Sequence, residues 1–151
     1  MDCTIYFATD HAGFELKNIL VDYVKNTLGY TVEDCGPMVF DPDDDYPDFI
    51  SQAAQKVSKA PTCKAIILGG SGQGEAIVAN RFSHVRAAVY YGGPDEIVKL
   101  SREHNDANIL SLGARFLTQQ KAKEVVQLWL ETPFSKDERH IRRIKKIEHV
   151  L

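Results

Sequence analysis

Short apolar runs alternate with longer amphipathic segments along almost the whole chain, and this alternation limits the possible folds more than any other feature. A short apolar run bounded by turn residues is typical of a buried strand, whereas apolar residues spaced three and four apart are typical of a helix. The predicted strands are 4–8, 30–34, 64–68, 86–90 and 107–112, and the predicted helices are 14–28, 46–58, 74–81, 94–104 and 118–131. Strands that alternate with helices predict an α/β fold in which helices cover both faces of a parallel sheet, joined by right-handed crossovers.

The length of 151 residues, with 44% apolar and 26% charged residues, predicts one domain over 1–151 with its own core. A net charge of −3 argues against a dedicated nucleic-acid or membrane-surface protein. No apolar run approaches the roughly 18 residues of a membrane span, and no basic segment precedes an apolar run at the N-terminus, so a cytoplasmic location is expected. The three cysteines Cys3, Cys35 and Cys63 show no CxxC pairing. We therefore expect reduced thiols rather than a disulfide framework or a zinc site.

A glycine-rich turn, GGSGQGE, separates the third predicted strand from the helix that follows it. Glycines let the backbone approach a ligand closely, and the unpaired N–H groups that open a helix attract an anion. The backbone donors belong to Gly70, Gly72 and Gly74, while Ser71 adds a hydroxyl and Glu75 a carboxylate. A glutamate in a first turn is often only a helix stabiliser, but beside this turn it is a candidate general base.

Other polar residues follow strands or helices that meet the same sheet. Asp10 and His11 come directly after the first strand, where ligands bind in open α/β sheets, although an N-cap and a surface histidine are the simpler readings. His104, Asn105 and Arg115 flank the fifth strand, and we expect all three at that same edge. The simpler readings give His104 a helix C-cap and Arg115 a solvated position.

The segment after Pro133 predicts a last helix with a basic face. Arg139 and Arg143 are four residues apart and therefore share a face, from which they are able to grip a phosphate; His140 lies between them. A solvated basic face and a nucleic-acid surface are the alternatives, and the lack of interleaved aromatic residues argues against the second. Tyr46 is either a hydroxyl donor to a sugar oxygen or a half-buried core residue.

Two familiar ligand motifs fail on inspection. The loop FDPDDDYPD starts like a calcium loop, but Tyr46 stands at the glycine position and Gln52 at the terminal glutamate position. The glycines of the turn run GxGxG after the third strand, rather than GxGxxG after the first, which argues against a nicotinamide site. No cofactor or metal motif remains, so metal-free acid–base chemistry on an anionic ligand fits best.

The chain resembles the ribose-5-phosphate isomerase B family, which includes the galactose-6-phosphate and allose-6-phosphate isomerases. The resemblance rests on six strings in a fixed order: DHAGFELK from Asp10, DYPD from Asp45, GGSGQGE from Gly69, REHNDAN from Arg102, GAR from Gly113 and RHIRRI from Arg139. It implies a three-layer α/β/α, Rossmann-like doubly wound fold with five parallel strands and an extra C-terminal helix. It also implies a homodimer or tetramer with active sites at the subunit interface, and metal-free conversion of ribose 5-phosphate to ribulose 5-phosphate through an enediolate.

Roles for individual residues follow from the resemblance. His104 with Asp10 would open the sugar ring, the N–H groups from Gly70 to Gly74 would stabilise the enediolate, and Ser71 would help move the proton between oxygens. The phosphate ligands would be His11, Arg115, Arg139 and Arg143, the last two reaching across from the partner subunit. Many family members carry a catalytic cysteine where this chain has Gly69, and the chain resembles instead the subgroup whose base is a glutamate, here Glu75.

Three alternatives remain open at this stage. The substrate is a five-carbon or a six-carbon sugar phosphate, because a pocket's depth cannot be read from a chain. A non-catalytic sugar-phosphate-binding module would use the same turn without needing Glu75 or His104. A protein that interacts through its basic last helix is the third possibility.

Overall fold

A computed structural model describes residues 3–150 and contains a five-stranded parallel sheet in the order β2-β1-β3-β5-β4. The strands are β1 (Ile5–Ala8), β2 (Val32–Asp34), β3 (Lys64–Gly69), β4 (Ala87–Tyr90) and β5 (Ile109–Gly113). The helices are α1 (Phe14–Asp22), α2 (Tyr46–Lys59), α3 (Gln73–Ala79), α4 (Asp95–Glu103), α5 (Gln119–Glu131) and α6 (Glu138–Ile147). Two short 3-10 helices, η1 (His11–Gly13) and η3 (Ala114–Phe116), and a short π-helix, η2 (Tyr23–Thr27), complete the order. Each strand and helix predicted from the sequence is present.

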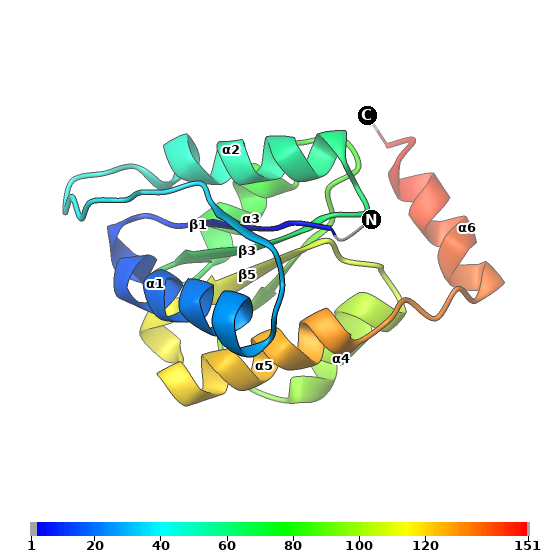
Figure 1. Cartoon of the computed structure of the whole chain (residues 1–151). Coiled ribbons are helices and arrows are strands. Elements are labelled where there is room, and N and C mark those ends of the chain that lie inside the picture. The colour runs from blue at the N-terminus through cyan, green and yellow to red at the C-terminus, as the bar shows by residue number, and fades with distance from the viewer. Residues whose placement is uncertain (1–2, 151) are drawn as a thin grey trace.

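Helices cover both faces of the sheet, which confirms the predicted three-layer fold (Figure 1). Successive residues of β3 point to opposite faces, and all of them except the half-buried Lys64 are buried. Ile66 and Leu68 pack in one core cluster with α1, α4 and α5, whereas Ala65 and Ile67 pack in the other with α2 and α3. A continuous apolar strand of this kind is expected in a sheet buried on both sides.

The chain adds β2 on one side of β1 and β3 on the other, so the order in which strands are added to the sheet reverses at β1. From β1 the chain moves outward to the edge strand β2, and it then returns to place β3 on the other side of β1. The loops that leave the carboxyl ends of β1 and β3 therefore run to opposite faces and leave a crevice between them. Asp10 lies in the loop after β1, and the glycine-rich turn follows β3.

A buried ion pair holds the loop that follows β2. Lys17 on α1 is completely buried, and its ammonium group donates to both carboxylate oxygens of Asp34 at 2.8 and 2.6 Å. It also donates to the carbonyl oxygen of Pro37 at 2.8 Å. This lysine consequently ties the start of the 35–45 loop to α1.

The expectation of reduced thiols is wrong for two of the three cysteines. Cys3 and Cys63 form a disulfide across a sequence separation of 60 residues, with their Cα atoms 4.9 Å apart. The physical reason is the strand order, because Cys3 precedes β1, Cys63 precedes β3, and these strands are neighbours in register. Cys35 has a free thiol.

Helix α6 lies beside the body of the molecule rather than in either helical layer (Figure 1). None of the helices within residues 3–150 has the length and apolar character needed to cross a membrane.

Candidate active site

The glycine-rich turn lies at the carboxyl end of β3 and leads directly into α3. Gly72 adopts the left-handed conformation with φ of 78°, and a Cβ there would lie 3.0 Å from the carbonyl carbon of Leu112. Glycine is required here both by its conformation and by the close approach of β5. Buried Ser111 donates its hydroxyl to the Gly72 carbonyl at 2.6 Å and holds the turn in place. Within the described residues no hydrogen bond uses the N–H of Ser71 or Gly72, so both donors are available to a ligand.

Glu75 lies in the first turn of α3, with only 4% of its surface exposed. Its carboxylate reaches back over β3, because a Cβ built on Gly69 would overlap the Glu75 carboxyl group. Burial raises the pKa of Glu75, and the negative charge of Asp10 acts in the same direction, against a smaller opposite effect of the Glu75 backbone N–H. Over the described part of the chain no ion pair involves Glu75. The carboxylate is therefore free to accept a proton.

Because Gly69 has no side chain, the Glu75 carboxylate is able to occupy the space beside it. A cysteine at this position and the Glu75 carboxylate would compete for the same space. The free thiol of Cys35 does not substitute for such a cysteine, because it is half-buried and burial raises its pKa to about 11. A thiol with that pKa is protonated at neutral pH and is a poor base.

Asp10 and His11 lie where β1 ends, as predicted. Asp10 is buried, and its carboxylate accepts from the N–H of Ala12 at 2.9 Å, so the N-cap reading is confirmed. His11 bonds to Asp44, whose Oδ1 accepts from the backbone N–H at 2.9 Å and lies 2.7 Å from the ring Nδ1. The pKa of His11 is raised, first by this hydrogen bond and against the effect of burial.

Tyr46 and Arg115 lie over the glycine-rich turn from two other elements. The Tyr46 hydroxyl oxygen is 2.6 Å from the position that a Cβ on Gly74 would take, so only glycine leaves room for the ring. Arg115 Nη1 is 3.1 Å from the equivalent position on Gly70, and the Arg115 N–H donates to the Gly70 carbonyl at 3.1 Å. One edge of the sheet thus gathers a carboxylate, a hydroxyl, a guanidinium group and backbone donors.

Asp10, His11 and Asp44 also place one potential metal ligand atom each within 4.8 Å of one another. All three groups already have hydrogen-bond partners, since Nδ1 of His11 bonds to Asp44 and Asp10 caps the η1 segment. Hydrogen bonds within the protein thus account for the positions of these three side chains.

His104 and Asn105 lie at the opposite edge from Glu75, which corrects the expectation that they share it. Both follow α4 and precede β5, and Arg86, just before β4, donates to the Asn105 carbonyl at 3.0 Å. A crossover helix runs antiparallel to the strands, so its last residues lie at the amino ends of the strands. The five residues of β5 separate the two edges by roughly 13 Å, at about 3.3 Å per residue.

The two arginines of α6 lie with this second group. His140 is buried and stacks on His104, with ring centroids 4.3 Å apart and an interplanar angle of 17°. Burial lowers the pKa of His140, which favours a neutral ring against His104. Arg139 and Arg143 are exposed on α6. The predicted site residues therefore form two groups, one at each edge of the sheet.

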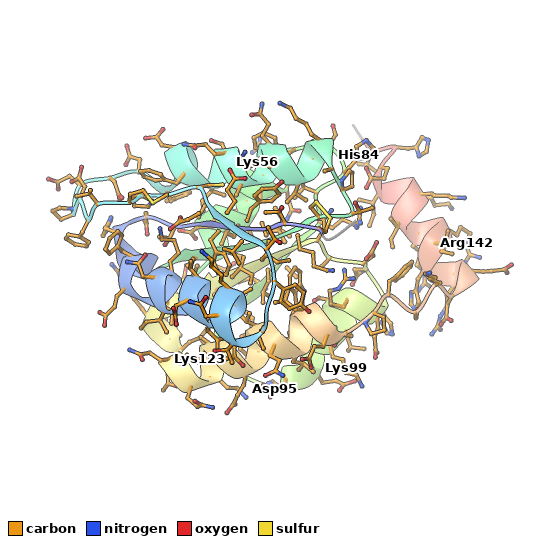
Figure 2. All side chains as sticks on the ribbon, in the orientation of Figure 1. Lys56, His84, Asp95, Lys99, Lys123 and Arg142 are labelled. Atoms are coloured by element: carbon orange, nitrogen blue, oxygen red, sulfur yellow. A yellow bond between two sulfur atoms is a disulfide. The ribbon has the colours of Figure 1, made fainter. Side chains whose placement is uncertain are left out.

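The exposed side of α6 is hollowed. A cavity of about 720 Å³ lies along the helix, and its lining includes Ile141, Arg142 and Lys145. Figure 2 shows Arg142 on α6, away from the sheet and its covering helices. This hollow is remote from Glu75, and the carboxylate in its lining, Glu138, is exposed. It is therefore not the acid–base site.

Three residues important for the site were not identified from sequence. Ser111 had a signal, because it is a single hydroxyl residue within the apolar run of β5. Lys17 was part of a quoted motif, but its burial depends on the path of the 35–45 loop. Asp44 had no local signal, since it is one of several aspartates in an acidic loop.

The family model for the Ribose/Galactose Isomerase family matches residues 5–147. Ribose-5-phosphate isomerase B of Mycobacterium tuberculosis is 41% identical over 140 residues, which cover 93% of this chain and 85% of the relative. The probable ribose-5-phosphate isomerase B of Mycoplasma genitalium is 38% identical over 148 residues, covering 97% of this chain and 95% of the relative.

Solved structures of similar fold carry the same family name. Ribose-5-phosphate isomerase B from Mycoplasma genitalium, with bound ribulose-5-phosphate, has a TM-score of 0.93 and 37% identity, covering 99% of this chain and 96% of the other. The type B ribose 5-phosphate isomerase of Trypanosoma cruzi has a TM-score of 0.91 and 37% identity, covering 99% and 97%. The chain therefore belongs to the ribose/galactose isomerase family and is a sugar-phosphate isomerase.

Proposed function

We propose that this protein interconverts ribose 5-phosphate and ribulose 5-phosphate, with Glu75 as the base. The observation that carries the proposal is the buried Glu75 carboxylate held against Gly69 beside the glycine-rich turn. Support for the substrate comes from the relatives named ribose-5-phosphate isomerase B and from the neighbour solved with ribulose-5-phosphate.

In the proposed reaction Glu75 takes the proton from C2 of the open-chain aldose. The electron pair of the C–H bond forms the enediolate double bond, and negative charge develops on the C1 oxygen. Backbone N–H groups between Gly70 and Gly74 stabilise that charge, an effect worth roughly 3 to 4 kcal/mol per donor where measured. Ser71 helps transfer the hydroxyl proton from the C2 oxygen to the C1 oxygen, and Glu75 returns its proton to C1 to give the ketose.

The other candidate residues bind and open the sugar. His104 with Asp10 opens the furanose ring, and Tyr46 and Asn105 contact the sugar oxygens. His11, Arg115, Arg139 and Arg143 hold the phosphate, which positions C2 against Glu75. The protein needs no metal or organic cofactor for this chemistry.

These residues lie at opposite edges of one chain, so we propose that two copies build each site. One copy supplies Glu75 and its neighbours, and the partner supplies His104, Asn105 and the arginines of α6. A two-fold dimer satisfies this requirement twice, because each copy carries both groups. The position of α6 beside the body of the molecule supports contact with another copy, and pairing of dimers into a tetramer is compatible with it (Figure 1).

The proposal is tested by assaying ribose 5-phosphate turnover in the wild type, Glu75→Gln and Glu96→Gln. Glu96 is the matched control, because it also lies in a helix first turn but is exposed. We expect Glu75→Gln to lose about 10²- to 10⁴-fold in kcat, the usual contribution of a positioned general base, and Glu96→Gln to keep normal turnover. Near-normal turnover in Glu75→Gln would contradict the role of this carboxylate.

Two further measurements separate the alternatives. Exchange of the C2 hydrogen of ribose 5-phosphate with solvent requires a base and would not occur in a module that only binds. Turnover of allose 6-phosphate or galactose 6-phosphate well above that of ribose 5-phosphate would replace the proposed substrate with a six-carbon sugar, an outcome that the family's range includes.

A further inference from the structure

The carboxylate of Asp44 is bonded to His11 in a way that fixes both the backbone and the ring. One oxygen, Oδ1, accepts from the His11 backbone N–H at 2.9 Å and lies 2.7 Å from the ring Nδ1. The Asp44 side chain is only 6% exposed, whereas that of His11 is 31% exposed. An inner carboxylate thus supports a histidine that is open to a ligand.

This geometry determines which ring nitrogen faces outward. A carboxylate accepts but does not donate, so Nδ1 of His11 carries its proton toward Asp44. Nε2 is left without a partner in the described residues. To donate from Nε2 to a phosphate oxygen as well, the ring must carry both protons and be an imidazolium.

The charges around His11 favour that cationic form. Its pKa is raised first by the hydrogen bond to Asp44, against burial, and then by the charges of Asp10 and Asp44, while Arg115 lowers it. The other Asp44 oxygen, Oδ2, is buried and has no hydrogen-bond partner within residues 3–150. A carboxylate that is this strongly desolvated is stabilised by a positive charge on the His11 ring that it contacts.

The acidic loop itself holds Asp44 in position. The Asp43 N–H donates to Oδ1 of Asp41 at 3.0 Å, and the Asp44 N–H donates to the Asp41 carbonyl at 3.3 Å. Lys17 anchors the same loop near its start, through Pro37. The aspartates on either side of Asp44 are exposed, so Asp44 alone turns inward from this run.

We propose that Asp44 is a positioning residue for phosphate recognition, which holds the His11 imidazolium with its Nε2 donor directed at the substrate phosphate. This inference rests on the proposed function for the identity of the phosphate ester, but not for the His11–Asp44 pair itself. The acidic loop, which fails as a calcium site, acquires a role in anion binding through its one buried member.

The test compares Asp44→Asn with the matched control Asp43→Asn, which removes the same charge from an exposed neighbour. Asparagine keeps an oxygen that accepts from His11, so the loop is expected to stay folded. At pH 7.5 we expect KM for ribose 5-phosphate to rise about tenfold in Asp44→Asn, because the charge-assisted hydrogen bond from His11 to the phosphate is weakened. We expect kcat to change much less, and Asp43→Asn to behave as the wild type.

The pH dependence of KM distinguishes this role from a purely structural one, which would not change it. Without the Asp44 charge the pKa of His11 falls, so the imidazolium is lost at lower pH. The rise in KM should therefore shrink toward pH 5.5, and the NMR titration of the His11 ring should shift to lower pH in Asp44→Asn only. Asp44→Glu, which restores the charge, should recover part of the affinity.

Binding of inorganic phosphate, measured by calorimetry, separates this inference from the proposed function. If the wild type fails to turn over ribose 5-phosphate but Asp44→Asn still weakens phosphate binding, the function is wrong and the role of Asp44 stands. If Asp44→Asn matches Asp43→Asn in phosphate affinity and in the His11 titration, the role of Asp44 is refuted.

Discussion

Glu75 combines two properties that favour catalysis and oppose stability. It is almost completely buried, and burial raises its pKa. The charged form, which the proposed reaction requires as the base, is therefore the form that the fold disfavours. A carboxyl whose pKa is higher in the folded than in the unfolded state costs stability above the unfolded pKa. That cost disappears as the pH falls below the ordinary value of a glutamate.

Replacing Glu75 by glutamine should therefore remove activity without removing stability. At pH 7 we expect the free energy of unfolding of Glu75→Gln to be equal to or greater than that of the wild type, by up to about 1 kcal/mol, as for relief of a buried polar group. Urea unfolding at pH 7 and pH 4 measures this, and any gain should be smaller at pH 4. A clear loss of stability at pH 7 would mean that the carboxylate is structural. For the wild type, the acid limb of the kcat profile should lie above the ordinary pKa of glutamate.

At the scale of elements, α6 is held by its two ends rather than by a packed face. Near its start His140 stacks on His104, and just beyond its end Glu148 bonds to Nδ1 of His84 at 2.8 Å and to Nη1 of Arg86 at 3.0 Å. Figure 2 shows His84 beside the carboxyl-terminal end of α6. Arg86 also donates to the carbonyl of Asp106 at 3.1 Å, so one guanidinium group joins α6 to the turn that follows His104.

The backbone around this attachment is strained. The non-glycine residues with positive φ within 3–150 are His84 (64°), Asp106 (45°) and Lys136 (61°). His84 bonds to Glu148 just beyond α6, and Lys136 precedes the helix. Asp106 closely follows His104, which stacks on His140 of α6. Such conformations cost about 1 to 3 kcal/mol each and persist where the surrounding structure imposes them. The orientation of α6, and with it that of Arg139 and Arg143, depends on this cluster.

Loss of the Glu148 carboxylate should loosen α6. For Glu148→Gln we expect faster amide hydrogen exchange over 138–147. We also expect KM to rise about three- to tenfold, because the arginines proposed to bind the phosphate would no longer be held in place to orient the substrate. Glu138→Gln is the control, since it removes a charge from the exposed start of the same helix. Equal exchange rates and KM values in both variants would show that the cluster does not position the helix.

The sequence predicts the helices and strands better than it predicts which distant residues come into contact. The strands and helices follow from local periodicity, and Asp10, Tyr46, Glu75 and Arg115 come together because the carboxyl ends of parallel strands share an edge. The misplacement of His104 was avoidable, since a residue between a helix and the next strand belongs at the amino edge. The Cys3–Cys63 pair and the contact of Asp44 with His11 were not foreseeable, because one depends on strand order and the other on the path of a loop.

At the scale of the whole molecule, the two groups of candidate site residues are too far apart to meet within one chain. The Glu75 group and the His104 group are separated by the length of the strands, and α6 presents the second group beside the amino edge (Figure 1). A two-fold partner would bring unlike edges together at two equivalent places. This arrangement predicts that two inactive variants can restore one another.

A heterodimer of Glu75→Gln with His104→Ala would contain one site with both defects and one site with none. We therefore expect about half of the wild-type activity per dimer when the heterodimer is isolated through two different affinity tags, since one of its two symmetric sites is intact. Each homodimer should be nearly inactive. The matched control pairs Glu75→Gln with Asp10→Asn, which lies at the same edge, so that both sites of the heterodimer stay defective and no activity returns. No recovery in the test pair, once the heterodimer is verified by mass, would place the complete site within a single chain. Recovery in the control pair would instead show that Asp10 and Glu75 of one site come from different chains.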